Sequence, residues 1–152
     1  MANQQVKSVV LYDGVSAPTI VVQEGSSAAS YEAGDLVKFD SAGQVILATN
    51  GLIAGIAGMD STASAGSASD TQFMELINYN ALYLICNTST SDQAEVGECS
   101  AIVFTAGAHT VAGGTAAAGE VHIVGIYPGD LGVTNGRNIV RFSTYDATEI
   151  GD

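Results

Sequence analysis

The apolar residues of this chain come in short, β-branched runs that turn-forming residues interrupt. Residues 6–12 (VKSVVLY) and 19–23 (TIVVQ) are two such runs, and DGVSAP separates them. Runs of this kind between Gly, Asp and Pro are typical of β-strands. No window combines apolar residues at i, i+3, i+4 and i+7 with a helix cap. The sequence therefore predicts an all-β chain with little helix.

The same pattern predicts strands along the rest of the chain, at residues 35–40, 44–48, 52–57, 73–77, 82–86, 101–104, 121–126 and 138–145, with a brief strand near Val111. The last of these runs alternates: Val140 and Phe142 point to one side, and Ile139 and Arg141 to the other. Two stretches of small residues, 60–70 and 106–119, are predicted loops. We predict a small antiparallel β-barrel or sandwich with long Gly/Ala/Ser-rich loops.

A length of 152 residues fits one domain with its own core. We predict an N-terminal strand or arm at residues 1–17, a single β domain at 18–145 and a C-terminal tail at 146–152. We expect no targeting segment, because MANQQVKSVVLYDG lacks the apolar core of a signal peptide. No apolar run reaches the roughly 18 residues that a membrane-spanning helix needs.

The charge of the chain argues against two classes of partner. Sixteen acidic residues oppose four basic ones, for a formal net charge of −12. Binding to DNA or RNA depends on cations that neutralise phosphates, so we expect no nucleic-acid partner. The same reasoning predicts no binding to anionic membrane surfaces.

Charged residues gather in the predicted hairpin 33–48, where Asp35, Lys38 and Asp40 lie close together. Alternation places Val37 and Phe39 on one face of its first strand and the other residues on the opposite face. We interpret the charges as the hydrated side of a hairpin. Surface ion pairs of this kind contribute about 0–1 kcal/mol and need no catalytic explanation.

At Asp35, Glu98, Glu120 and Asp130 an acid directly follows Gly, mostly just before a predicted strand. Gly permits turn conformations, and a charge at the end of a strand discourages strands of other molecules from pairing there. We therefore expect these four carboxylates to be hydrated.

The residue types that carry catalysis or bind metals are scattered. His109 and His122 have no second ligand at metal-binding spacing, and residues 60–70 lack an EF-hand pattern. No GxSxG or phosphate-binding loop is present. We predict a chain that is not an enzyme and has no metal or cofactor. Cys86 and Cys99 are predicted as two free thiols, with a disulfide as the alternative.

The stretch YEAGDLVKFDSAGQVILATNGLIAGIAG, residues 31–58, resembles the head-decoration (cement) proteins of tailed bacteriophages. The residues that carry the resemblance are Ala33, Gly34, Asp35, Val37, Gly43, Val45, Ala48, Gly55, Ile56 and Ala57. The resemblance implies a structural protein made in the host cytoplasm and added to the outer surface of the capsid in the virion. Its implied partners are the major capsid protein and two further copies of itself, in trimers at three-fold or quasi-three-fold positions.

Residues 6–12 are the candidate for a capsid-binding arm that adds a strand to a neighbouring subunit. The candidate contact residues are Val6, Val9, Val10, Leu11 and Tyr12. The alternative is that this run forms the first strand of the chain's own sheet. Two other functions stay open: a carbohydrate-binding or host-adhesion module, for which Tyr79 and Tyr83 are the candidate platform, and another virion subunit such as a tail-tube protein.

Overall fold

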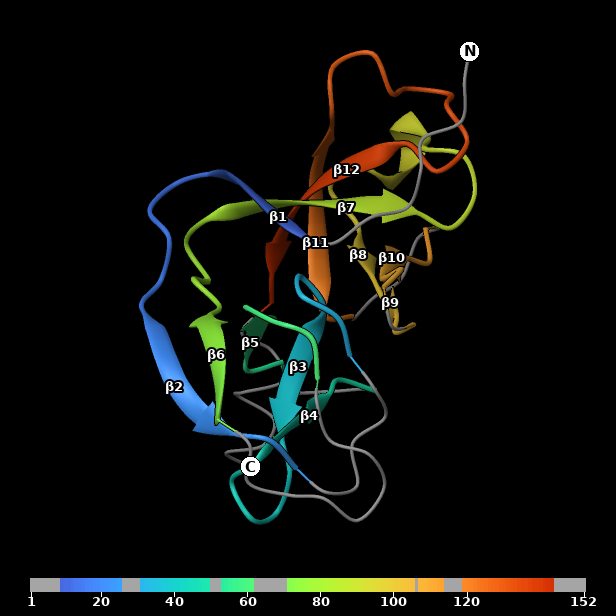
Figure 1. The fold of residues 1–152 in the computed structure, drawn as a ribbon. Coiled ribbons are helices and arrows are strands. Elements are labelled where there is room, and N and C mark those ends of the chain that lie inside the picture. The colour runs from blue at the N-terminus through green and yellow to red at the C-terminus, as the bar shows by residue number, and fades with distance from the viewer. Residues whose placement is uncertain are drawn as a thin grey trace.

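The computed structural model describes residues 9–25, 31–49, 53–61, 71–105, 107–113 and 119–143. These residues form twelve strands and one short 3-10 helix (Figure 1), so the predicted all-β fold is confirmed. Most of the predicted loop 60–70 and the whole predicted tail 146–152 lie outside the described residues. Within the described part of the chain, no helix is long and apolar enough to cross a membrane.

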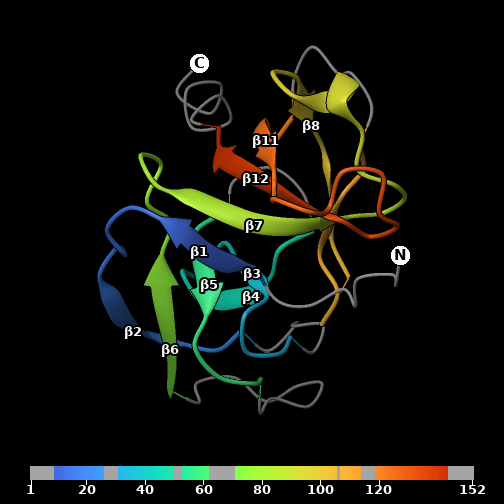
Figure 2. The same cartoon turned by 90° about the horizontal axis from the view of Figure 1, so that it is seen from above.

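Seven strands form the first sheet, which we call sheet A: β1 (Val10–Asp13), β7 (Leu82–Asn87), β8 (Cys99–Ser100), β9 (Ile102–Val103), β10 (Thr110–Val111), β11 (Val121–Ile126) and β12 (Arg137–Phe142). Their order is β8-β11-β12-β7-β10-β9, and β1 also pairs with β7. Figure 2 shows β1 running alongside β7. The pairs are antiparallel except β10 with β7, which is parallel.

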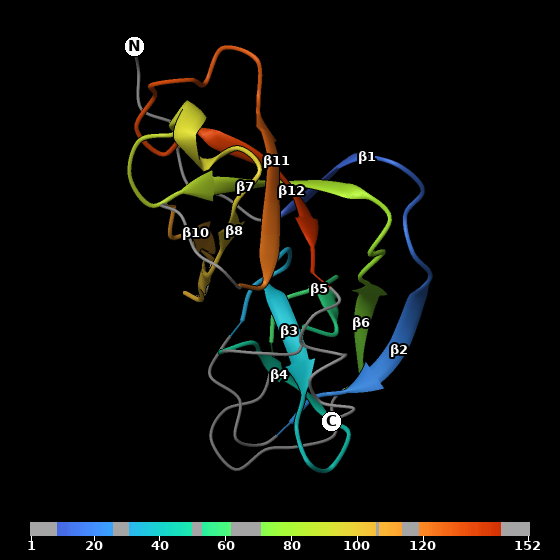
Figure 3. The ribbon, with the colours of Figure 1, turned by 180° about the vertical axis from the view of Figure 1, so that it is seen from behind.

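Five strands form sheet B: β2 (Thr19–Gln23), β3 (Leu36–Phe39), β4 (Val45–Leu47), β5 (Gly55–Ala57) and β6 (Thr71–Leu76). Their order is β2-β6-β5-β3-β4, and all these pairs are antiparallel. After β2, Glu24 bridges to Val45 in β4, and Gly25 N donates to Val45 O at 2.9 Å. Sheet B therefore nearly closes into a small barrel (Figure 3).

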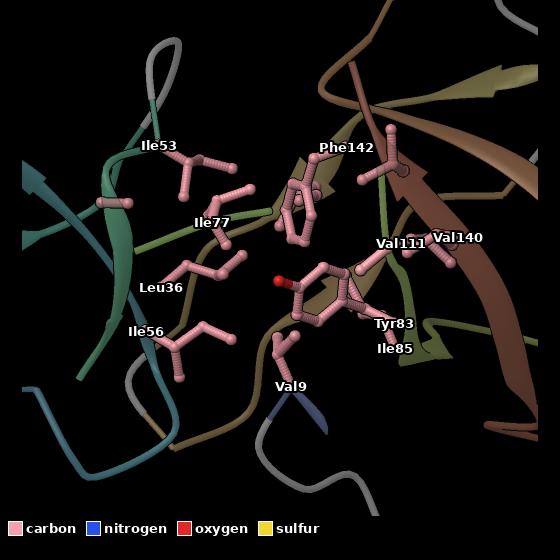
Figure 4. Close-up of a cluster of buried hydrophobic side chains, with 14 of the residues drawn as sticks. Val9, Leu36, Ile53, Ile56, Ile77, Tyr83, Ile85, Val111, Val140 and Phe142 are labelled. Carbon is pink, nitrogen blue, oxygen red and sulfur yellow. The ribbon is translucent and has the colours of Figure 1, made fainter. Parts of the chain in front are cut away.

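The barrel encloses its own apolar cluster, and a larger core joins the two sheets. The barrel cluster contains Tyr31, Val37, Val45, Leu47, Ala57 and Met74. Figure 4 shows the larger core, where Leu36 and Ile56 of sheet B face Tyr83 and Phe142 of sheet A. The rings of Tyr83 and Phe142 meet edge to face, 5.1 Å apart. The two sheets therefore fold as one packed unit.

Strand β3 departs from the predicted pattern of one hydrated and one buried face. Leu36 and Val37 are both fully buried, because Leu36 packs in the core between the sheets and Val37 inside the barrel. Phe39, at the end of the strand, is exposed. In β12 the predicted alternation is confirmed: Val140 and Phe142 are buried while Arg141 is exposed.

The 3-10 helix η1 (Gln93–Glu95) begins in a capping box, in which the Asp92 side chain accepts from Ala94 N. The Glu95 carboxylate reaches back to Asp92 N and also accepts from Asn87 Nδ2 at 2.9 Å. Because Asn87 ends β7, these bonds fix the helix against sheet A. Burying the carboxylate of Glu95 is tolerated because polar groups surround it.

Candidate functional site

The motif residues form the predicted hairpin. Strands β3 and β4 pair antiparallel with Val37 opposite Leu47. The turn contains Gly43 at φ +76°, a left-handed conformation that glycine adopts without a steric penalty. Asp40 Oδ1 accepts from Ala42 N at 2.8 Å and from Gln44 N at 2.9 Å. Asp40 therefore holds the turn, as a carboxylate commonly does.

Asp35 contradicts the prediction of a hydrated carboxylate. Its side chain is fully buried, and it accepts from Glu32 N at 2.9 Å and from Gly107 N at 2.9 Å. Gly107 lies in the segment before β10 of sheet A, so this carboxylate joins the start of β3 to the other sheet. The expectation is also wrong for Asp130, which is 3% exposed, whereas Glu98 and Glu120 are half-buried.

His109 lies beside Asp35 in the same buried region. Its Nε2 is 3.4 Å from Asp35 Oδ1, and Leu36 N donates to that nitrogen at 3.3 Å. The ring also packs edge to face on Phe104. Because Leu36 N donates to Nε2, this nitrogen carries a lone pair, and the imidazole is neutral rather than the cation of an ion pair. Burial lowers the pKa of His109, although the charge of Asp35 opposes that shift. The motif acid and His109 thus form a buried structural link, which sequence reasoning missed because the two residues are far apart along the chain.

The buried imidazole predicts a pH dependence of stability. His109 takes up a proton more easily in the unfolded chain, near pH 6.5, than in the folded protein, where its pKa is lower. Stability should therefore be highest above that pH and fall as the pH drops below about 6.5, with a slope of at most about 1.4 kcal/mol per unit. Urea denaturation at closely spaced pH values measures this slope.

One variant separates His109 from the other titrating groups. His109→Gln keeps an acceptor for Leu36 N but cannot titrate, so its slope between about pH 5.5 and 6.5 should be clearly smaller than that of the wild type. A wild-type slope in His109→Gln would show that another group causes the effect.

The predicted arm residues lie mostly in the chain's own sheet. Val10, Leu11 and Tyr12 belong to β1, which pairs antiparallel with β7. This agrees with the alternative prediction that the run forms the first strand of the chain's own sheet. Val9 is buried in the core between the sheets, and Val6 lies outside the described residues. Whether this segment contacts a capsid subunit stays a prediction.

Strand β1 contributes to an exposed apolar surface on sheet A. Val10 is directly opposite Leu84, and Leu84 is opposite Ile139, so these three side chains share one face. Ile139 lies over Gly125, and Val124 occupies the adjoining bulge of β11. Val10 is 52% exposed and Val124 44%. We call the surface formed by Val10, Tyr12, Leu84, Val124 and Ile139 the sheet A face.

Beside the sheet A face, aromatic and charged groups form a chain of contacts. The Tyr12 ring meets Tyr127 edge to face at 5.9 Å, and the Arg137 guanidinium lies 3.9 Å from the centre of the Tyr127 ring. Arg137 donates from Nε to Asp130 Oδ2 at 2.8 Å. This hydrogen bond lowers the pKa of Asp130, so the pair stays charged. The contacts hold the segment after β11 against the sheet and orient Tyr12.

The two tyrosines proposed as a sugar platform differ in burial. Tyr83 is fully buried, and its hydroxyl oxygen accepts from Asn78 N at 3.0 Å. Tyr79 is half-buried and its hydroxyl donates to Ile53 O at 3.4 Å. Sugar stacking needs an exposed ring face, so this prediction is wrong for Tyr83.

Cys86 and Cys99 are both thiols, as predicted. Strands β11 and β12 separate β8, which carries Cys99, from β7, which carries Cys86. Cys99 Sγ instead lies 3.3 Å from His122 Nδ1 on the neighbouring strand. Sequence reasoning missed this pair because only the register of β8 against β11 brings the two side chains together. Among the described residues, no three His, Cys, Asp or Glu side chains are grouped to hold a metal ion.

Comparisons with known proteins leave the family open. Neither a scan against protein-family models nor searches of the curated proteins and the solved structures found a match to this chain.

Proposed function

We propose that this chain is a structural protein of a tailed-bacteriophage virion, which binds the outside of the expanded capsid and stabilises the shell. The observation that carries the proposal is the structure of the motif stretch, residues 31–58. Its described parts form three neighbouring strands of the barrel, β4-β3-β5, and its Gly and Asp residues occupy positions where their type matters. The residues that carry the resemblance therefore lie together in one part of the barrel.

The sheet A face supports the proposal as the surface that contacts the capsid. Exposed apolar side chains gathered on one face are typical of protein interfaces. Tyr12, held by Tyr127, adds the kind of aromatic side chain that is enriched in such interfaces. In this proposal β1 meets the major capsid protein through its exposed side chains while its backbone stays paired with β7.

Assembly as trimers would strengthen attachment without requiring a tight individual contact. Three linked copies that touch several capsid subunits raise one another's effective concentration. Binding only to the expanded lattice stabilises that lattice by mass action. Three chains carry 3 × (−12) = −36 formal charges, which favours solubility.

Sedimentation with capsids tests the proposal. Purified protein is mixed with undecorated heads of the phage that encodes it, in the expanded and the unexpanded form, and the pellets are analysed. We expect binding to expanded heads alone. Val10→Asp should weaken this binding by about tenfold or more, because it places a charge within an apolar contact.

The matched control is Val21→Asp, which changes a still more exposed strand valine on sheet B. It should bind expanded heads like the wild type. Absence of wild-type binding would contradict the proposed function, and loss of binding in Val21→Asp alone would contradict the choice of the sheet A face. Binding on a glycan array without capsid binding would favour the adhesion alternative, and assembly into tubes the tail-tube alternative.

A further inference from the structure

Three chemically active side chains form one row across sheet A. His122 on β11 is directly opposite Cys99 on β8 and directly opposite Arg141 on β12. Residues that face each other across antiparallel strands project from the same side of a sheet. His122 and Arg141 are exposed and Cys99 is half-buried, so solvent reaches the row.

The thiol and the imidazole are close enough to exchange a proton. Cys99 Sγ lies 3.3 Å from His122 Nδ1 and 3.9 Å from Nε2. An imidazole at this distance can take the thiol proton and leave the nucleophilic thiolate. Cys86 has a different environment: it is 6% exposed and lies opposite Arg137 of the neighbouring strand β12. The two thiols should therefore differ strongly in reactivity.

Arg141 adds a positive charge next to this pair. Among the described residues, no ion pair joins Arg141 to a carboxylate. The net charge of −12 repels anions at long range, but salt near physiological strength screens charges beyond about 8 Å. At contact distance the guanidinium therefore offers a small molecule a positive charge at this row.

We propose that Cys99 is a site of thiol–disulfide exchange with small anionic disulfides, of which glutathione disulfide is one. His122 takes the proton from the Cys99 thiol, and the resulting thiolate attacks one sulfur of the disulfide. A new bond forms between Cys99 Sγ and the attacked sulfur as the original sulfur–sulfur bond of the disulfide breaks. The leaving sulfur departs as a thiolate and takes up the proton, so Cys99 is oxidised and the leaving sulfur reduced. Arg141 binds a carboxylate of the incoming molecule.

Mass spectrometry of the folded protein with glutathione disulfide tests the site. The wild type and Cys86→Ser should each gain one glutathione on Cys99, and Cys99→Ser should gain none. Absence of an adduct on the folded wild type, or an adduct on Cys86 instead, would overturn the proposal. The melting temperature of each variant, measured in parallel, confirms that the folded protein is compared.

Rates of thiol–disulfide exchange in the Cys86→Ser background test the roles of His122 and Arg141. His122→Gln should slow exchange on the order of tenfold with both glutathione disulfide and cystamine, a cationic disulfide. Arg141→Gln should slow exchange about fivefold with glutathione disulfide and should not slow it with cystamine. An unchanged rate in His122→Gln would overturn the role of the imidazole, and equal effects of Arg141→Gln on both reagents would overturn the preference for anions. The proposal is independent of capsid binding, because the reaction needs the protein alone.

Discussion

Asp35→Ala should lower the free energy of unfolding by about 4 kcal/mol. The substitution removes a buried carboxylate that accepts from Glu32 N and Gly107 N, and each main-chain donor left without a partner costs about 1–3 kcal/mol. It also breaks the link between the start of β3 and the segment before β10. The urea midpoint at about pH 8, well above the pH at which His109 takes up a proton in the unfolded chain, measures the loss.

Asp40→Ala is the matched control, because Asp40 belongs to the same hairpin and also accepts from two main-chain N–H groups. Asp40 is partly exposed, so water can replace the lost acceptor, and we expect a cost of about 1 kcal/mol. Equal costs for the two variants would contradict the difference in burial on which this prediction depends.

Gly55→Ala should be the second severe substitution, with a cost of about 3 kcal/mol. A Cβ at Gly55 would collide with the main-chain oxygen of Glu75 and would lie 2.7 Å from Met74 Cγ. The oxygen belongs to the backbone of β6, the strand paired with β5, so it cannot move without separating the two strands. Thermal unfolding followed by circular dichroism measures the effect.

Gly43→Ala provides the comparison for Gly55→Ala. Gly43 has a positive φ, but no atom lies within 4 Å of the added Cβ. Its substitution carries only the conformational cost of a left-handed residue, about 1 kcal/mol. If Gly55→Ala were no more destabilising than Gly43→Ala, the close approach of β5 and β6 would not be what requires glycine at residue 55.

Local patterns in the chain predicted the strands because they depend on residues close together in the sequence. The alternation of β12 and the turn at Gly43 both follow from neighbouring residue types and are confirmed. The same rule failed for β3. Alternation assumes that one face of a strand meets water, whereas the barrel lies on one side of β3 and the core between the sheets on the other.

The chemistry of individual side chains was less predictable. Asp35 looked like a hydrated charge, and Cys99 and His122 looked isolated, because the groups that surround them belong to other parts of the chain. A signal was present for the Cys–His pair, since both residues lie in or next to predicted strands. The order and register of those strands were needed to bring them together.

The amino-acid sequence by itself determined the all-β class, most strand positions and the hairpin of the motif. Only the tertiary structure decided which carboxylate is buried and which thiol has a histidine beside it. The physical reason is that strand formation and turns depend mainly on neighbouring residues. Burial and the approach of reactive groups depend instead on the pairing of strands that are distant along the chain.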